Sequence, residues 1–96
     1  MDASSVAAVL LPYKRQIAEL DVKRLLLVGS VARNRSGPSS DVDFVVEFNG
    51  PATFLGYMGL LELLETALAL PIDLTTVKAL RPEIADNILS GALRVA

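Results

Sequence analysis

Two aspartates, Asp41 and Asp43, lie two positions apart in the stretch DVDFVVEF, which alternates acidic and apolar side chains. In an extended strand such side chains leave the same face, about 6.6 Å apart along the strand. A third aspartate, Asp73, lies in a second predicted strand, Pro71–Thr76. If the two strands are neighbours, about 4.8 Å apart, all three carboxylates share one face. We therefore expect the chemistry of this chain to take place on that face.

Three carboxylates this close together repel one another. At an effective dielectric constant near 20, each pair costs on the order of 2–3 kcal/mol. A bound divalent cation removes that cost, and an oxygen-only ligand set favours Mg²⁺ or Mn²⁺ over zinc. Two such ions lie about 3.5–4 Å apart in phosphoryl-transfer sites, a span that three carboxylates could bridge. The pattern indicates a metal site formed by Asp41, Asp43 and Asp73.

A Gly-Ser turn precedes the aspartates in the sequence. Gly29 lets a ligand approach the backbone closely. Ser30 offers a hydroxyl and an N–H at the start of a predicted helical turn, which suits phosphate. Arg33 lies one turn later and could reach the same phosphates as a forked cation. These residues are candidates for binding a triphosphate.

Each candidate also has a structural explanation when it is taken alone. Gly29-Ser30 could be an ordinary turn between a strand and a helix, and Arg33 a solvated surface charge. Asp41 could begin a strand, and Asp73 could be an ordinary polar strand residue. Glu47 shares the acidic face, but it lies further along the strand and we favour a solvated role for it. The combination is a much more specific signal than any one of its members.

The composition excludes several kinds of catalytic site. The 96 residues contain neither cysteine nor histidine, so thiolate nucleophiles, serine–histidine relays and histidine–zinc sites are ruled out. The net charge is −2 and no basic block stands out, so we expect no direct contact with nucleic acid. The length suits a single domain over residues 1–96.

The chain is more apolar than a small soluble monomer requires. Apolar residues make up 52% of it, and the mean hydropathy is +0.48. Either a partner covers apolar surface, or the core is rich in leucine and alanine. The longest apolar region, Phe54–Ile72, is interrupted by Glu62 and Glu65, so we expect a cytoplasmic protein with no membrane contact.

Hydrophobic periodicity predicts helices and strands in alternation. They are a helix over Ser4–Leu20, a strand over Arg24–Val28, a helical turn over Ser30–Asn34, a strand over Val42–Phe48, a helix over Thr53–Leu68, a strand over Pro71–Thr76 and a helix from Pro82 to about Leu89. Arg35–Ser40 reads as a loop, and Leu93–Val95 could form a short edge strand. Ser4 or Ser5 could cap the first helix, which Pro12 should kink or split.

This order predicts an α/β domain with a small sheet, covered by helices on one side. The acidic face should then look away from those helices. The helix Thr53–Leu68 carries more apolar residues than one stripe needs. One stripe contains Phe54, Met58, Leu61, Leu64 and Leu68, and beside it lie Tyr57, Leu60 and Leu63. We expect Tyr57 and Leu60 to contribute to a partner interface, unless the wide stripe is buried within the domain or a homodimer.

The segment GSVARN…SDVDFVVEF resembles the signature of the nucleotidyltransferase (DNA polymerase beta-like) superfamily, Gly-Ser-x-Ala-Arg-Gly…Ser-Asp-x-Asp. The rest of the chain resembles the minimal nucleotidyltransferases of bacteria and archaea. The residues that carry the resemblance are Gly29, Ser30, Ala32, Arg33, Ser40, Asp41, Asp43 and Asp73. Two features depart from the family pattern. Asn34 replaces a glycine, although Asn tolerates a left-handed backbone, and Ala67–Pro71 lacks the glycine often found there.

The resemblance implies a nucleotidyltransferase fold with a mixed sheet of three to four strands. It also implies that Asp41, Asp43 and Asp73 hold two Mg²⁺ ions. Nucleotide binding would fall to the residues of the Gly-Ser segment and to the serine before the aspartates, namely Gly29, Ser30, Arg33 and Ser40. A nucleoside monophosphate would then pass to a hydroxyl group, which Asp73 could help to deprotonate.

Minimal members of the family commonly pair with a small all-helical HEPN-type protein, often a ribonuclease toxin. The resemblance therefore implies an Mg²⁺-dependent adenylyltransferase that uses ATP, modifies a toxin hydroxyl, in the family pattern that of a tyrosine, and acts as the antitoxin. Two alternatives stay open: a catalytically silent antitoxin or binding subunit, and an enzyme for a small hydroxylated molecule such as an antibiotic. A homo- or hetero-oligomer is compatible with each of them.

Overall fold

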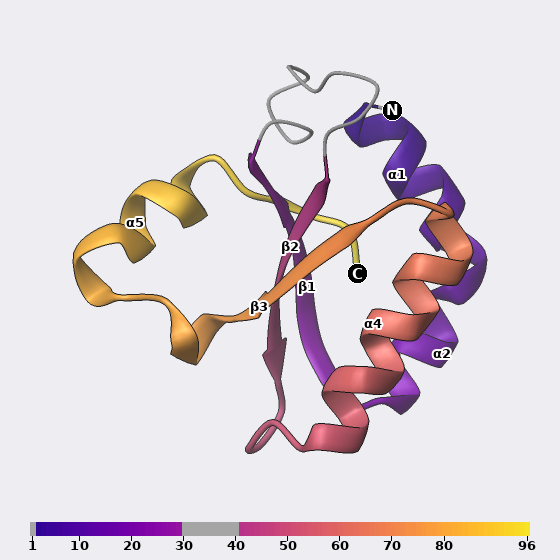
Figure 1. The fold of residues 1–96 in the computed structure, drawn as a ribbon, viewed down its shortest axis with the longest axis horizontal. Coiled ribbons are helices and arrows are strands. Elements are labelled where there is room, and N and C mark those ends of the chain that lie inside the picture. The colour runs from indigo at the N-terminus through magenta and orange to yellow at the C-terminus, as the bar shows by residue number, and fades with distance from the viewer. Residues whose placement is uncertain (1, 30–40) are drawn as a thin grey trace.

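The computed structural model describes residues 2–29 and 41–96, and a four-stranded mixed sheet of order β3-β2-β1-β4 lies at its centre (Figure 1). The strands are β1 (Val22–Val28), β2 (Val42–Phe48), β3 (Ile72–Thr76) and β4 (Leu93–Arg94). β1 pairs antiparallel with both β2 and β4, whereas β2 and β3 are parallel. The predicted sheet is confirmed, including the short edge strand near the end of the chain.

The described helices are α1 (Ala3–Leu10), α2 (Lys14–Glu19), α4 (Phe54–Leu68) and α5 (Pro82–Ser90), with 3-10 turns at Leu11–Tyr13 and Val77–Ala79. Pro12 lies in the turn between α1 and α2, so the predicted split of the first helix is confirmed. The predicted cap is wrong: the Asp2 carboxylate, not Ser4 or Ser5, caps α1 and accepts from the Ser5 N–H at 2.8 Å. Among the described helices, none is long and apolar enough to cross a bilayer.

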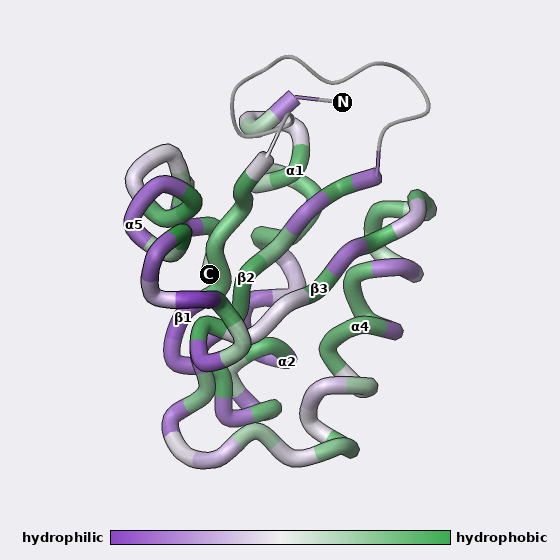
Figure 2. The backbone as a smooth tube through the Cα atoms, turned by 60° about the vertical axis from the view of Figure 1, so that its left-hand side comes forward, coloured by the Kyte–Doolittle hydropathy of each residue, from purple (hydrophilic) through white to green (hydrophobic). Residues whose placement is uncertain are grey.

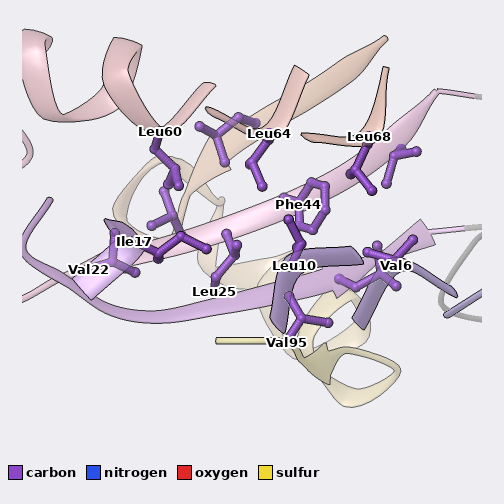
Figure 3. Packing of buried hydrophobic residues seen from close by; sticks show 14 residues of the cluster. Val6, Leu10, Ile17, Val22, Leu25, Phe44, Leu60, Leu64, Leu68 and Val95 are labelled. Atoms are coloured by element: carbon purple, nitrogen blue, oxygen red, sulfur yellow. The ribbon is translucent and has the colours of Figure 1, made fainter. Parts of the chain in front are cut away.

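The main core lies between one face of the sheet and the helices α1, α2 and α4. Alternate residues of β2 point into it, and among them Phe44 is almost completely buried. Figure 3 shows Phe44 between Leu10 of α1 and the buried side chains Leu64 and Leu68 of α4. The period-2 pattern of β2 thus puts its apolar side chains under the helices and its acidic ones on the opposite face.

A second apolar cluster lies on that opposite face and corrects the prediction that all helices cover one side. Leu26, Val28 and Val45 form it, and Ile88 and Leu89 of α5 pack against them. α5 therefore lies across the sheet from α4 (Figure 1). The reason is visible in β1, which ends in an uninterrupted apolar run (Figure 2). A central strand of this kind is buried on both faces and needs cover on each.

The predicted partner interface on α4 is also wrong. Leu60 is fully buried in the main core. Tyr57 is half-buried, and its hydroxyl donates to the Leu74 carbonyl oxygen of β3. Both residues therefore hold α4 on the sheet. The apolar side chains that α4 leaves exposed are at its first turn, where Phe54 is 77% and Leu55 81% exposed.

The link between α4 and β3 keeps its turn without glycine. Ala69 adopts the left-handed conformation, with φ 53°, and its N–H donates to the Glu65 carbonyl at 2.9 Å. This is the helix-ending position that glycine usually occupies. The segment Ala67–Pro71 therefore has an alanine at the left-handed position where a glycine is usual, but the helix still ends in the same kind of turn. β3 then enters the sheet beside β2.

Candidate active site

Asp43 and Asp73 lie directly opposite each other on the parallel strands β2 and β3. Adjacent strands are about 4.8 Å apart, and residues in register point to the same face. α4 provides the long crossover that parallel pairing requires. The prediction that the third aspartate lies beside the Asp-x-Asp strand is confirmed in its geometry.

Asp43 lies at the centre of this group, because β1 pairs on its other side and places Val28 in register with it. It is half-buried, whereas Asp41 and Asp73 are exposed. Burial raises the pKa of the Asp43 carboxyl, and the negative charges of Asp73 and Asp41 raise it further. The charges of its two acidic neighbours therefore act on Asp43, in line with the repulsion that the sequence pattern predicted.

Gly29 meets this group at the end of β1. Its φ is +75°, and a Cβ at this position would overlap the Asp43 Oδ2 atom. The sequence predicted that Gly29 lets a ligand approach the backbone. In the structure the absence of a side chain at Gly29 also lets the Asp43 carboxylate lie against that backbone. The other candidates for nucleotide binding, Ser30, Arg33 and Ser40, lie outside the described residues, as does Asn34.

The acidic group, Asp41, Asp43 and Asp73, has the oxygen donors for a hard divalent cation, but its carboxylates are spread apart. In the part of the chain that the structure describes, no three acidic side chains are gathered closely enough to hold a metal ion. Nor does Asp41, Asp43 or Asp73 form an ion pair with any basic side chain of that part. Carboxylate oxygens with uncompensated charge suit Mg²⁺ or Mn²⁺. Metal binding by these three residues stays a prediction.

Glu47 does not belong to the acidic group, although it lies on the same face of β2. It is near the other end of the strand, where its Oε1 accepts from the Arg24 Nε at 2.6 Å and its Oε2 lies 3.9 Å from the Lys23 Nζ. The Arg24 hydrogen bond lowers the pKa of the Glu47 carboxyl. The solvated role that the sequence favoured for Glu47 is therefore corrected: the side chain is half-buried in a cross-strand ion pair.

Beside the carboxylates lies an open pocket of about 260 Å³, which Asp43, Asp73 and Thr75 share with Leu80 and Ile88. Sequence analysis did not single out Leu80 or Ile88. For Ile88 the available signal was its spacing of four residues from Ile84 within α5. Leu80 precedes the helix in extended backbone, so helical spacing gave no signal for it. The site therefore has an acidic edge and an apolar wall.

Comparison with known proteins identifies relatives along almost the entire chain. The model of the nucleotidyltransferase domain family matches residues 13–95. Protein adenylyltransferase MntA of Thermococcus cleftensis is 31% identical over 91 residues, which cover 94% of this chain and 92% of that protein.

Solved structures show the same architecture. The structure of a minimal nucleotidyltransferase superposes with a TM-score of 0.84 at 28% identity, covering 97% of this chain and 95% of that one. A chain from the complex of tri-AMPylated Shewanella oneidensis HEPN toxin with its MNT antitoxin gives a TM-score of 0.67. That match covers 97% of this chain and 71% of the other at 14% identity, so it is a likeness of fold alone.

Proposed function

This chain belongs to the nucleotidyltransferase domain family, as a minimal nucleotidyltransferase, and we propose that it transfers AMP from ATP to a hydroxyl group of a HEPN-type partner. One observation carries this proposal: Asp43 and Asp73 lie in register on parallel strands, with Gly29 against the Asp43 carboxylate. The Thermococcus relative is a protein adenylyltransferase, which supports AMP as the transferred group.

We assign the three carboxylates different tasks from their positions. Asp43 is half-buried between two strands, which fixes its place, so it would be the central metal ligand. The exposed Asp41 and Asp73 would complete the metal-binding set. Bound Mg²⁺ would neutralise phosphate charge and favour ionisation of the attacking hydroxyl. Because Gly29 has no side chain, its backbone leaves room for the Asp43 carboxylate. This close approach would keep the phosphate bound at the Gly-Ser turn next to the metal-binding carboxylates.

The transfer itself is a substitution at the α-phosphorus of ATP. The acceptor oxygen forms a new bond to this phosphorus, and the bond to the pyrophosphate leaving group breaks. Asp73, at the exposed edge of the group, would accept the hydroxyl proton.

We propose a tyrosine of the HEPN-type protein as acceptor and an antitoxin role for this chain. The AMPylated toxin in the Shewanella complex supports that choice of partner.

The experiment combines the chain with the HEPN-type protein that co-purifies with it, together with ATP and Mg²⁺. Intact-mass spectrometry should detect added AMP on the partner, and peptide mapping should place it on a tyrosine. Asp43→Asn and Asp73→Asn should abolish the adduct, as should removal of divalent cations with EDTA. Stable association without any adduct would instead identify a silent binding subunit, and modification of a small molecule alone would exclude the protein acceptor.

A further inference from the structure

The wall of the active-site pocket comes from the segment after β3, which contributes none of the three aspartates. Leu80 precedes α5 and Ile88 lies in its second half. Both side chains are half-buried and line the pocket that also contains Asp43 and Asp73. Any molecule that reaches these carboxylates from inside the pocket therefore lies against the two aliphatic side chains.

This wall is only partly covered by the protein itself. α5 has no fully buried residue, although it is amphipathic and packs on Leu26, Val28 and Val45. Ile84, which lies on the same side of α5 as Ile88 but outside the pocket, is 43% exposed. Aliphatic side chains left half-buried around a pocket gain stability when an apolar group covers them. The part of the pocket next to Asp43 and Asp73 is thus acidic, and the part formed by Leu80 and Ile88 is apolar.

We infer that Leu80 and Ile88 hold the nucleoside of the triphosphate, with its base packed against their side chains. This inference rests on the proposed function. The described residues that line the pocket come from this chain, and the nucleotide is the reactant that the proposed function has this chain bind by itself. The pocket also shares Gly29 and Asp43 with the expected phosphate site, so a group bound there lies next to the reacting phosphate. Apolar walls with a few polar groups are the usual form of such small-molecule sites.

The test measures the affinity of the chain for ATP and for inorganic tripolyphosphate in Mg²⁺ buffer by titration calorimetry. Tripolyphosphate carries the charge of ATP without its nucleoside. Leu80→Ala and Ile88→Ala should each weaken ATP binding about five- to tenfold, because each removes apolar contact area. Neither variant should change tripolyphosphate binding. Ile84→Ala is the matched control, because Ile84 belongs to the same helix but does not line the pocket, and it should leave ATP binding unchanged.

If the alanine variants unfold, a variant that fills the pocket provides a second test. Ile88→Phe adds volume without opening a cavity, and it should weaken ATP binding while tripolyphosphate binding is kept. Two results would overturn the inference: unchanged ATP affinity in folded variants, or an equal loss for both probes. If unchanged ATP affinity comes with loss of transfer to the acceptor, the wall belongs to the acceptor site. If the unsubstituted chain binds neither probe, the proposed function itself fails and the inference fails with it.

Discussion

The Asp43 carboxylate occupies the space that a side chain at Gly29 would need. Asp43 lies in β2, and Gly29 directly follows Val28, the last residue of the antiparallel strand β1 and the one in register with Asp43. Gly29 also has a positive φ, which side-chain-bearing residues rarely adopt. The glycine of the Gly-Ser turn is therefore required twice, for its backbone conformation and for the position of a carboxylate.

Gly29→Ala should damage activity far more than stability. The left-handed conformation of an alanine costs about 1–2 kcal/mol of unfolding free energy. Its Cβ would also push the Asp43 carboxylate out of position, which should lower nucleotide transfer at least about a hundredfold. Transfer assays and urea unfolding measure the two effects. Gly50→Ala is the matched control, because no atom lies near its Cβ position and φ there is not positive, and it should remain active. A fully active Gly29→Ala would show that this contact is unimportant.

Asp43→Asn should abolish transfer and stabilise the metal-free chain at neutral pH. The pKa of Asp43 is raised in the fold, so its charged form is less stable there than in the unfolded chain. Stability contributed by the protonated group is complete below the unfolded pKa, about 3.9, and is lost as pH rises through the higher folded value. The variant should therefore melt at a higher temperature than the parent at pH 7, and the difference should shrink toward pH 3. A lower melting temperature at pH 7 would contradict the unfavourable burial and repulsion assigned to the charged Asp43 carboxylate.

Glu47→Gln makes the corresponding carboxyl-to-amide change on the same face of β2 and should have the opposite effect on stability. The Arg24 hydrogen bond lowers the pKa of Glu47, so its charged form is the more stable one in the fold. This contribution is present above the unfolded pKa and is lost as pH falls through the lower folded value. The variant should melt below the parent at pH 7 and converge with it in acid, while transfer activity is kept. Loss of transfer would place Glu47 in the active site after all.

Ala69→Gly should raise the free energy of unfolding by about 0.5–1 kcal/mol, because it removes the steric cost of a left-handed alanine at the end of α4. Urea unfolding measures this gain. Ala67→Gly supplies the control, since Ala67 lies within α4, where glycine costs about 1 kcal/mol. If both substitutions destabilise equally, the conformation of Ala69 is not what limits this turn.

Local patterns in the sequence were sufficient for the strands and for the acidic face. β2 follows the alternation of Asp43, Phe44 and Val45, which is a property of neighbouring residues and needs no tertiary information. Pro12 marks the division between α1 and α2 for an equally local reason, its missing N–H. α4 was harder, because apolar residues surround much of it. A helix with two apolar stripes does not reveal which one faces the sheet, and Leu60 proved to be core.

The sequence by itself determined the candidate residues for the chemistry, because Asp41, Asp43, Asp73 and Gly29 are recognisable by type and spacing. Only the tertiary structure decided how they meet. The register that sets Asp43 beside Asp73 depends on strand pairing between segments far apart in the chain, with α4 between them. The apolar wall of Leu80 and Ile88 likewise depends on α5 crossing to the second face. α5 lies there because β1 is apolar on both sides and must be covered on both.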